Sequence, residues 1–368
     1  RSASYLIIRK LTSISITDGE NVLYFYNDMN AKHGTIRKAL KKRRGREGRM
    51  NRKWRKTALA GLTAAGMMAA TVSAEDSSYK IGICQLTQHE ALEQATKGFQ
   101  DYVSEKLGDR VTFDVQNASG EVSNCVTVIN AFVSEDVDLI LANSTPVLQA
   151  AASATDTIPV LGTSVTDYPA ALDLEEWNGV AGTNVSGTSD CAPLQQQAEM
   201  IMELIPDAKE IGILYCSAEP NSRYQTDIIK SSLEELGCSA EVKEYTFTGT
   251  DDIAAVTTTA AENCDVIYIP TDNTAASNAE LINNICEPAG VPVICGEKGV
   301  CEGCGIATLT IDYYELGQIT GEMAVDVLEE DADISQMAVR QAEQVKKCYV
   351  PERCEKLGIT IPDDYEKL

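Results

Sequence analysis

Apolar runs typical of β-strands alternate with amphipathic helical segments through most of the chain. The segment 89–107, for example, places its apolar residues at the helical period and stands between strand-like runs at 79–86 and 111–118. The series is expected to continue with helices over 123–135 and 145–155 and with strands over 137–143 and 158–165. Such alternation predicts parallel sheets that carry helices on both faces.

A second series of the same kind follows residues 179–190, which are rich in Gly, Ser and Thr and have the composition of a crossing segment. Its expected helices are 192–205, 223–237, 250–262 and 274–290, and its expected strands are 210–216, 239–247, 265–270 and 291–296. A strand and helix at 305–330, then a strand and short helix at 343–362, come after this series is complete. The chain is therefore expected to return to the first lobe.

These patterns predict an α/β fold of two doubly wound parallel-sheet lobes joined by a multi-strand hinge. The 368 residues are enough for two full hydrophobic cores. The first lobe is expected to comprise residues 78–184 and 305–330, and the second lobe residues 185–304 and 331–368.

The N-terminal part of the chain has the pattern of an export signal. A basic stretch at 50–56 precedes an uncharged apolar stretch that ends in Val-Ser-Ala at 72–74, which suits a signal peptidase. We expect a signal peptide over 50–74 and an exported protein, in the periplasm or on the outer face of the cytoplasmic membrane. Residues 1–49 are interpreted as a segment assigned upstream of the natural start, and no Cys stands at the cleavage site to form a lipobox.

Charge and cysteine content narrow the range of functions. Residues 1–74 hold 16 of the 31 basic and 4 of the 55 acidic residues, which leaves a net charge of −36 for the remainder. Such an acidic surface repels nucleic acid and anionic lipid. All 12 Cys lie after residue 74. Disulfides and buried free thiols both remain open for them, and the CxxC at 301–304 has no second CxxC or nearby His to favour a metal site.

Short polar side chains follow six of the expected strands, at the edge of the sheets where α/β proteins bind ligands. Any one of them could simply cap the next helix, but the pattern recurs in both lobes. A cleft between the lobes would bring together hydroxyls for a carboxylate and acids for an ammonium group. The candidate ligand-binding residues are Gln85, His89, Ser144, Thr145, Thr163, Ser164, Asn221, Ser222, Asp272, Asn273 and Asp312.

Signatures of catalysis and of cofactors are scarce after residue 74. The only His there is His89, and the chain has no GxSxG turn, GxGxxG loop or phosphate-binding loop. We therefore expect no enzyme activity, no cofactor and no metal. Two alternatives stay open beside a transport receptor: a sensory binding module and an amino-acid-processing enzyme on the same scaffold.

Four stretches resemble one family: GICQLTQHEALEQATKGF, ANSTPVLQAAASATDTIPVLGTSVTD, YIPTDNTAASN and TLTIDYYELGQITGEMA. The family is the tryptophan/tyrosine-type substrate-binding proteins of ABC transporters, whose fold is that of the leucine/isoleucine/valine-binding protein, a type I periplasmic binding protein. The resemblance covers about residues 79–365. It implies a monomeric receptor that captures an aromatic amino acid and delivers it to a membrane permease and its ATPase, with no nucleic-acid partner.

The resemblance also implies roles for some of the candidate residues. Ser144 and Thr145, with Thr163 and Ser164, would hold the carboxylate from the first lobe. Asp272 and Asn273 would reach the ammonium group from the second lobe, and Asp312 would lie near the hinge.

Overall fold

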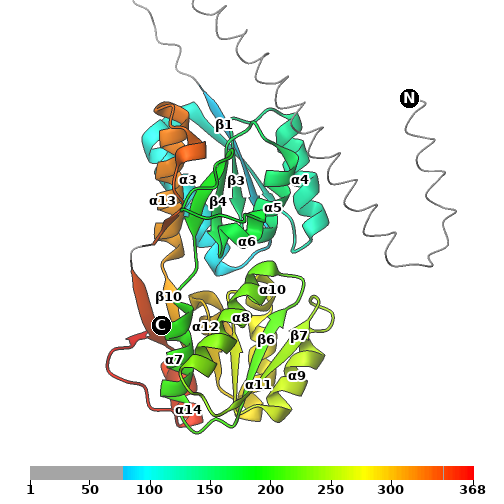
Figure 1. The fold of residues 1–368 in the computed structure, drawn as a ribbon, viewed down its shortest axis with the longest axis vertical. Coiled ribbons are helices and arrows are strands. Elements are labelled where there is room, and N and C mark those ends of the chain that lie inside the picture. Colours follow the sequence, from blue (N-terminus) through cyan, green and yellow to red (C-terminus); the bar gives the residue numbers. More distant parts are fainter. Residues whose placement is uncertain (1–77, 343) are drawn as a thin grey trace, which may run out of the picture. The chain divides into compact units, whose positions relative to one another are not determined.

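The computed structural model describes residues 78–342 and 344–368, and these form two α/β lobes (Figure 1). The expected signal peptide and the segment before it lie outside the described residues. No helix in the described part of the chain is long and apolar enough to cross a membrane.

The first lobe is built on a six-stranded sheet in the order β11-β5-β4-β3-β1-β2, with every pairing parallel. Its strands are β1 (Tyr79–Gln85), β2 (Val111–Asn117), β3 (Leu139–Asn143), β4 (Val160–Val165), β5 (Val185–Ser189) and β11 (Arg340–Gln341). Its helices are α3 (Glu90–Leu107), α4 (Val122–Ser134), α5 (Thr145–Ala154), α6 (Tyr168–Leu172) and α13 (Tyr313–Glu329), with short 3-10 helices η1 (Gly108–Arg110) and η2 (Ile334–Gln336).

The second lobe repeats this plan on a seven-stranded sheet in the order β13-β12-β10-β9-β8-β6-β7. Its strands are β6 (Glu210–Cys216), β7 (Glu241–Phe247), β8 (Val266–Ile269), β9 (Val293–Cys295), β10 (Ala307–Ile311), β12 (Val345–Tyr349) and β13 (Glu366–Lys367). Its helices are α7 (Leu194–Leu204), α8 (Pro220–Glu235), α9 (Ile253–Asn263), α10 (Asn273–Ser277), α11 (Ala279–Ala289), α12 (Lys298–Cys304) and α14 (Pro351–Leu357). The strand β12 runs antiparallel to its neighbour β10, and β13 runs parallel to β12.

Each sheet is covered by helices on both faces, which confirms the predicted doubly wound architecture. In the first lobe one core packs α4, α5 and α6 against the sheet, and another packs α3 and α13 against the opposite face. The second lobe likewise has one core under α9, α11 and α12 and one under α7, α8 and α14.

The boundaries of the lobes differ from those predicted. The strand β5, expected in the second lobe, pairs with β4 of the first, and β10, expected in the first lobe, pairs with β9 of the second. The segment η2–β11 also joins the first lobe through β5. The composition of β5 explains why this strand was assigned to the wrong lobe. It is five residues long and contains Ser, Gly and Thr, a composition typical of a linker.

Over the residues that the structure describes, the chain crosses between the lobes three times: after β5, after β10, and between β11 and β12. After the second crossing α13 returns to the first lobe and packs along α3 (Figure 1). Gly98 and Gly317 allow this close approach. A Cβ on Gly317 would stand 2.1 Å from the carbonyl oxygen of Ala95, and one on Gly98 would stand 2.1 Å from that of Tyr314.

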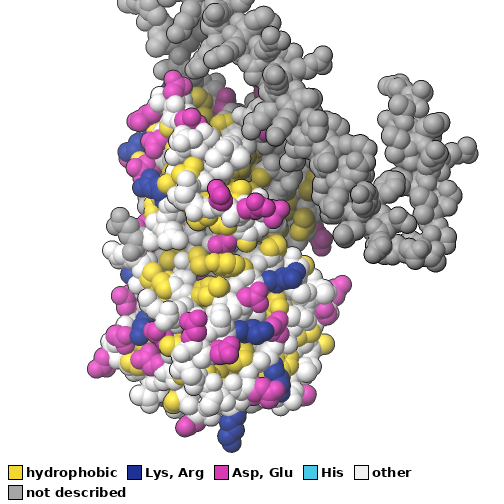
Figure 2. Space-filling model, in the orientation of Figure 1, with side chains coloured by type: hydrophobic (Ala, Val, Ile, Leu, Met, Phe, Trp, Pro, Cys, Tyr) yellow, Lys and Arg dark blue, Asp and Glu magenta, His cyan; other side chains and the backbone are white. Residues whose placement is uncertain are grey.

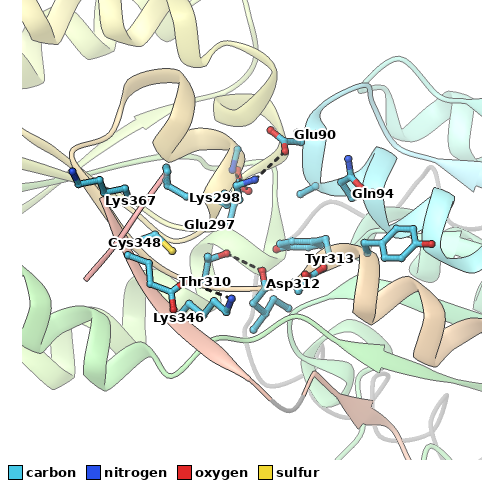
Figure 3. A pocket seen from close by; sticks show the side chains of 16 residues that line it. Glu90, Gln94, Glu297, Lys298, Thr310, Asp312, Tyr313, Lys346, Cys348 and Lys367 are labelled. Atoms are coloured by element: carbon cyan, nitrogen blue, oxygen red, sulfur yellow. Dashed lines mark hydrogen bonds and ion pairs between the residues drawn. The ribbon is translucent and has the colours of Figure 1, made fainter. Parts of the chain in front are cut away.

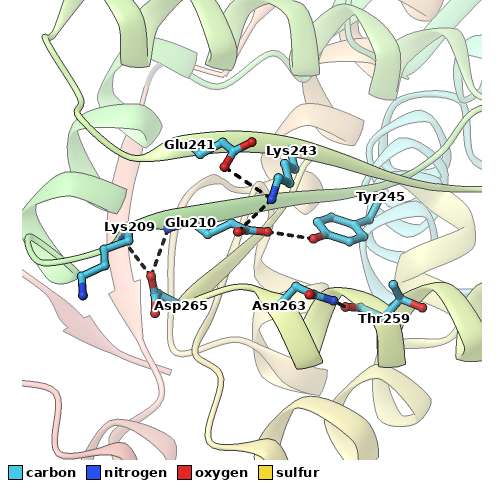
Figure 4. Close-up of polar contacts among 8 residues, drawn as sticks. All are labelled: Lys209, Glu210, Glu241, Lys243, Tyr245, Thr259, Asn263 and Asp265. Atoms are coloured by element: carbon cyan, nitrogen blue, oxygen red, sulfur yellow. Dashed lines mark hydrogen bonds and ion pairs between the residues drawn. The ribbon is translucent and has the colours of Figure 1, made fainter.

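Aspartates anchor the strands at the end of each sheet remote from the crossings. Asp265 Oδ2 accepts hydrogen bonds from the backbone N–H of Lys209 (2.7 Å) and Glu210 (3.0 Å), as Figure 4 shows. In the first lobe Asp138 accepts equivalently from the backbone N–H of Lys80 (2.7 Å). The two lobes therefore share this local device as well as their strand order.

Arg353 on α14 closes the C-terminal end of α12. Its guanidinium donates to four backbone carbonyls, at 2.8 to 3.0 Å, and to Asn283 Oδ1 at 3.1 Å. The carbonyls belong to Cys301, Glu302, Gly303 and Gly305. We expect Arg353→Ala to lower the free energy of unfolding by about 2 kcal/mol, because these carbonyls lose a charged donor. Urea denaturation measures the effect, and an unchanged midpoint would contradict this role.

Candidate ligand-binding site

The carboxyl-terminal edges of the two sheets face each other, and several side chains contact across the gap. His89 Nε2 lies 3.2 Å from Asn273 Oδ1, Thr87 Oγ1 lies 3.3 Å from Ser277 Oγ, and Lys298 Nζ lies 3.4 Å from Glu90 Oε1. The polar strand ends predicted to form a cleft are thus brought together from both lobes.

Three of the predicted carboxylate ligands have side-chain hydroxyls that are buried and lack a hydrogen-bond partner among the described residues. They are Ser144 and Thr145, which follow β3, and Ser164, which lies near the end of the neighbouring strand β4; all three are at most 6% exposed. Burying a hydroxyl without a partner is unfavourable, so such groups are uncommon in folded proteins. Three of them at adjacent strand ends indicate a place for a ligand with hydrogen-bonding oxygens.

The backbone at the same positions is strained. Ser144 has φ 123° and Ser164 has φ 54°, in the region that favours glycine. Strain of this kind concentrates at binding sites, where the surrounding structure holds it. Thr145 begins α5, so backbone N–H groups of the first turn of that helix are close to the three hydroxyls.

Asp190 is an acidic member of the site that the sequence analysis missed. It follows β5, is 3% exposed, and accepts hydrogen bonds from Thr166 Oγ1 (3.1 Å) and from Tyr313 Oη (3.0 Å). Burial raises its pKa, while the two hydroxyls act in the opposite direction. Asp190 and Tyr313 stand at the first and second crossings, so this bond joins two strands of the hinge.

On the second lobe Glu219 organises the polar groups that face the first lobe. Its carboxylate accepts from the backbone N–H of Asn273 (3.0 Å) and Thr274 (2.8 Å) and from the side chains of Asn273 (2.6 Å) and Asn221 (3.2 Å). Since these bonds use the Nδ2 groups of both asparagines, Asn221 Oδ1 remains a buried acceptor without a partner. Glu219 was not predicted; its place one residue before α8 is the only signal in the sequence, and a helix cap would explain it equally well.

Asp272 is used inside the second lobe. Its Oδ1 accepts from the backbone N–H of Ala275 (2.8 Å), and its Oδ2 accepts from the N–H of Cys216 and from Ser222 Oγ, both at 2.7 Å. The residue is 1% exposed, and burial together with Glu219 raises its pKa. Capping, the alternative considered for this residue, is therefore confirmed for α10.

Other predicted residues also serve the lobes themselves. The Gln85 side chain accepts a hydrogen bond from Thr96 Oγ1 and donates one to the backbone carbonyl of Thr87. Thr163 Oγ1 accepts a hydrogen bond from Thr188 Oγ1 within the first sheet. Asp312 is exposed and caps α13 through the N–H of Glu315 at 3.0 Å. Their contact with a ligand stays a prediction.

Pockets lie where the lobes meet. A pocket of about 370 Å³ is lined by Thr87, Glu219, Asn273 and Ser277, among others. Another, of about 390 Å³, combines charged groups of both signs, including Glu90, Lys298, Asp312 and Lys346 (Figure 3). Yellow apolar side chains show on the surface over the middle of the molecule in Figure 2.

No group of three or more potential metal ligands occurs in the described residues, and all 12 Cys are free thiols.

Residues 80–368 match the family model of the ABC transporter substrate binding protein. The chain belongs to this family. It is 35% identical over 252 residues to the tyrosine-binding protein of Clostridioides difficile (strain R20291), an alignment that spans 68% of this chain and 72% of that protein. The expected family of solute-binding receptors is therefore confirmed.

Solved structures agree with this assignment. The ABC domain from Streptococcus pneumoniae in complex with L-Trp is 33% identical, with a TM-score of 0.75 over 79% of this chain and 99% of that one. A leucine-binding protein from Thermotoga maritima is only 17% identical, with a TM-score of 0.54 over 70% of this chain and 84% of that one, and it shows the fold alone. The predicted type I periplasmic binding protein fold is confirmed.

Proposed function

We propose that this family member is the extracytoplasmic receptor of an ABC importer and captures an aromatic amino acid between its lobes. It would be exported as a monomer and deliver the ligand unchanged to the permease and ATPase in the membrane. The observation that carries the proposal is the trio of buried, partnerless hydroxyls on Ser144, Thr145 and Ser164. The L-Trp complex and the tyrosine-binding relative support the aromatic class.

The site matches the polar groups of an amino acid zwitterion. The three hydroxyls and the first turn of α5 offer donors to a carboxylate. Asp190, which directly follows the neighbouring strand β5, offers a carboxylate to an ammonium group. We assign the ammonium to Asp190 rather than to Asp272, because Asp272 accepts three hydrogen bonds within the second lobe, two of them from backbone N–H groups, whereas Asp190 accepts only from two hydroxyls.

A thermal-shift panel tests the ligand class. At a concentration of 100 times Kd, a ligand should stabilise the protein by about 2.7 kcal/mol. Among the twenty amino acids we expect tryptophan, tyrosine or phenylalanine to give the largest rise in melting temperature. A shift with sugars or nucleosides and none with amino acids would refute the proposal.

The affinity should also fall as the pH is lowered. Burial raises the pKa of Asp190 in the free protein, whereas a bound ammonium group stabilises its carboxylate form. At a pH below the pKa that Asp190 has in the free protein, binding must therefore release a proton from this carboxyl group. The affinity should then drop by up to about tenfold for each unit that the pH is lowered. Burial also raises the pKa of nearby Glu297, to about 7, so Asp190→Asn is the necessary comparison. Calorimetric titrations at several pH values should show the drop in the native protein and its loss in the variant.

A further inference from the structure

The contact between His89 and Asn273 fixes which ring nitrogen of His89 carries the proton. Asn273 Nδ2 lies 2.6 Å from Glu219 Oε2, and only the amide nitrogen can donate to that carboxylate. The amide oxygen of Asn273 must then face His89 Nε2, at 3.2 Å. An oxygen acceptor there requires Nε2 to be the protonated nitrogen.

Glu219 is held firmly enough to impose this orientation. It is 5% exposed and accepts from the backbone N–H groups of Asn273 and Thr274 at the start of α10 as well as from the hydroxyl of Thr274 (2.8 Å). Its position therefore depends on the backbone of the second lobe. A chain of hydrogen bonds therefore runs from Glu219 through Asn273 to His89 and spans the two lobes.

The other ring nitrogen of His89 is consequently an acceptor. Nδ1 is buried and has no hydrogen-bond partner among the described residues. Burial lowers the pKa of His89, which favours the neutral ring and keeps the lone pair on Nδ1 free. The side chain makes no capping bond to α3, although His89 occupies the N-cap position.

The position of His89 suits the far end of the ligand. The edge of the first sheet presents Asp190 after β5, Ser164 near the end of β4, Ser144 after β3, and His89 after β1. Three strand spacings, about 14 Å, separate β5 from β1. The proposed ligand has its ammonium at Asp190 and its carboxylate at the hydroxyls of Ser144, Thr145 and Ser164. Beyond these residues, toward β1, the next buried polar atom without a partner is His89 Nδ1.

We propose that His89 Nδ1 accepts a hydrogen bond from a donor on the ligand's ring, the phenol O–H of tyrosine or the indole N–H of tryptophan. The protein would then discriminate against phenylalanine, which leaves the buried acceptor unpaired. This inference rests on the proposed function and refines its ligand class.

The test is calorimetric titration of the purified protein with L-tyrosine and L-phenylalanine, which differ by one hydroxyl. In the native protein tyrosine should bind at least about tenfold more tightly, since leaving a buried acceptor unsatisfied is unfavourable. His89→Gln retains an amide donor near the position of Nε2 and has no group at the position of Nδ1. We expect it to bring the tyrosine-to-phenylalanine ratio to within about threefold of one.

His89→Asn is the matched control. Its amide oxygen can occupy the position of Nδ1, but nothing reaches Asn273, so both ligands should weaken together while their ratio is kept. A ratio near one in the native protein, or a ratio that His89→Gln leaves unchanged, would overturn the inference and leave the aromatic receptor standing. Failure of every aromatic amino acid to bind would overturn the proposed function and this inference with it.

Discussion

Asp190→Asn is expected to weaken binding of the aromatic amino acid by about 100-fold, because a buried ammonium group would lose its charged partner. The substitution keeps the shape of the side chain and can keep its contacts with Thr166 and Tyr313. The melting temperature of the free protein should hold or rise, because burial already disfavours the charge at this position. Calorimetric titration and a melting curve on each protein separate the two effects.

The matched control removes one carboxylate charge elsewhere in the same lobe. Asp333 is exposed and caps the 3-10 helix η2 through Ser335. Asp333→Asn should leave affinity within about twofold of the native value, since exposed charges are strongly screened. If Asp190→Asn binds as tightly as this control, the ammonium group lies elsewhere, and the assignment to Asp190 is wrong.

Gly317→Ala should lower the free energy of unfolding by about 3 kcal/mol, because the added methyl group cannot fit between α13 and α3. A Cβ at this position would stand 2.1 Å from the carbonyl oxygen of Ala95 and 2.9 Å from the backbone nitrogen of Phe99. These neighbours are backbone atoms, so the two helices must move apart. Since α13 directly follows a crossing between the lobes, closure around a ligand should suffer as well.

Gly249→Ala provides the comparison for this stability measurement. A Cβ on Gly249 would meet no atom within 4 Å, and the backbone there is not in the left-handed region. Its unfolding midpoint in urea should stay close to that of the native protein. Equal midpoints for Gly317→Ala and Gly249→Ala would show that α13 and α3 can separate without loss.

The sequence was most informative where the hydrophobic period was clear. The helix expected at 89–107 is α3, and the strand and short helix expected at 343–362 are β12 and α14. The segment 274–290 instead forms most of two helices, α10 and α11, which meet at Asn278. A break of one residue hardly alters the helical period, so the pattern could not show it.

The candidate ligand site was predictable as far as strand ends could be located. Ser144 and Thr145 were proposed because they follow the apolar run of β3, and Ser164 because it lies near the end of β4. Asp190 was missed because β5 is short and polar, and its buried hydroxyls bond within the lobe, as Thr188 does to Thr320 (2.8 Å). Such partners come from distant parts of the chain, so local pattern could not reveal that β5 is a buried strand.

The same limit applies to telling a cap from a ligand contact. Asp272 and Asp190 are both acidic residues that follow a strand and are almost fully buried. They differ in their surroundings, because Asp272 accepts three bonds from its own lobe, two of them from backbone N–H groups, whereas Asp190 accepts only from two hydroxyls. That difference depends on tertiary packing and is absent from the local sequence.

The proposed site would hold a zwitterion at both of its charged ends. Calorimetric titration with L-tyrosine, with tyramine, which lacks the carboxylate, and with 3-(4-hydroxyphenyl)propionate, which lacks the ammonium group, measures the contribution of each end. We expect each analogue to bind at least about 100-fold more weakly than tyrosine, because each leaves buried polar groups unpaired. Binding of either analogue as tightly as the amino acid would contradict it.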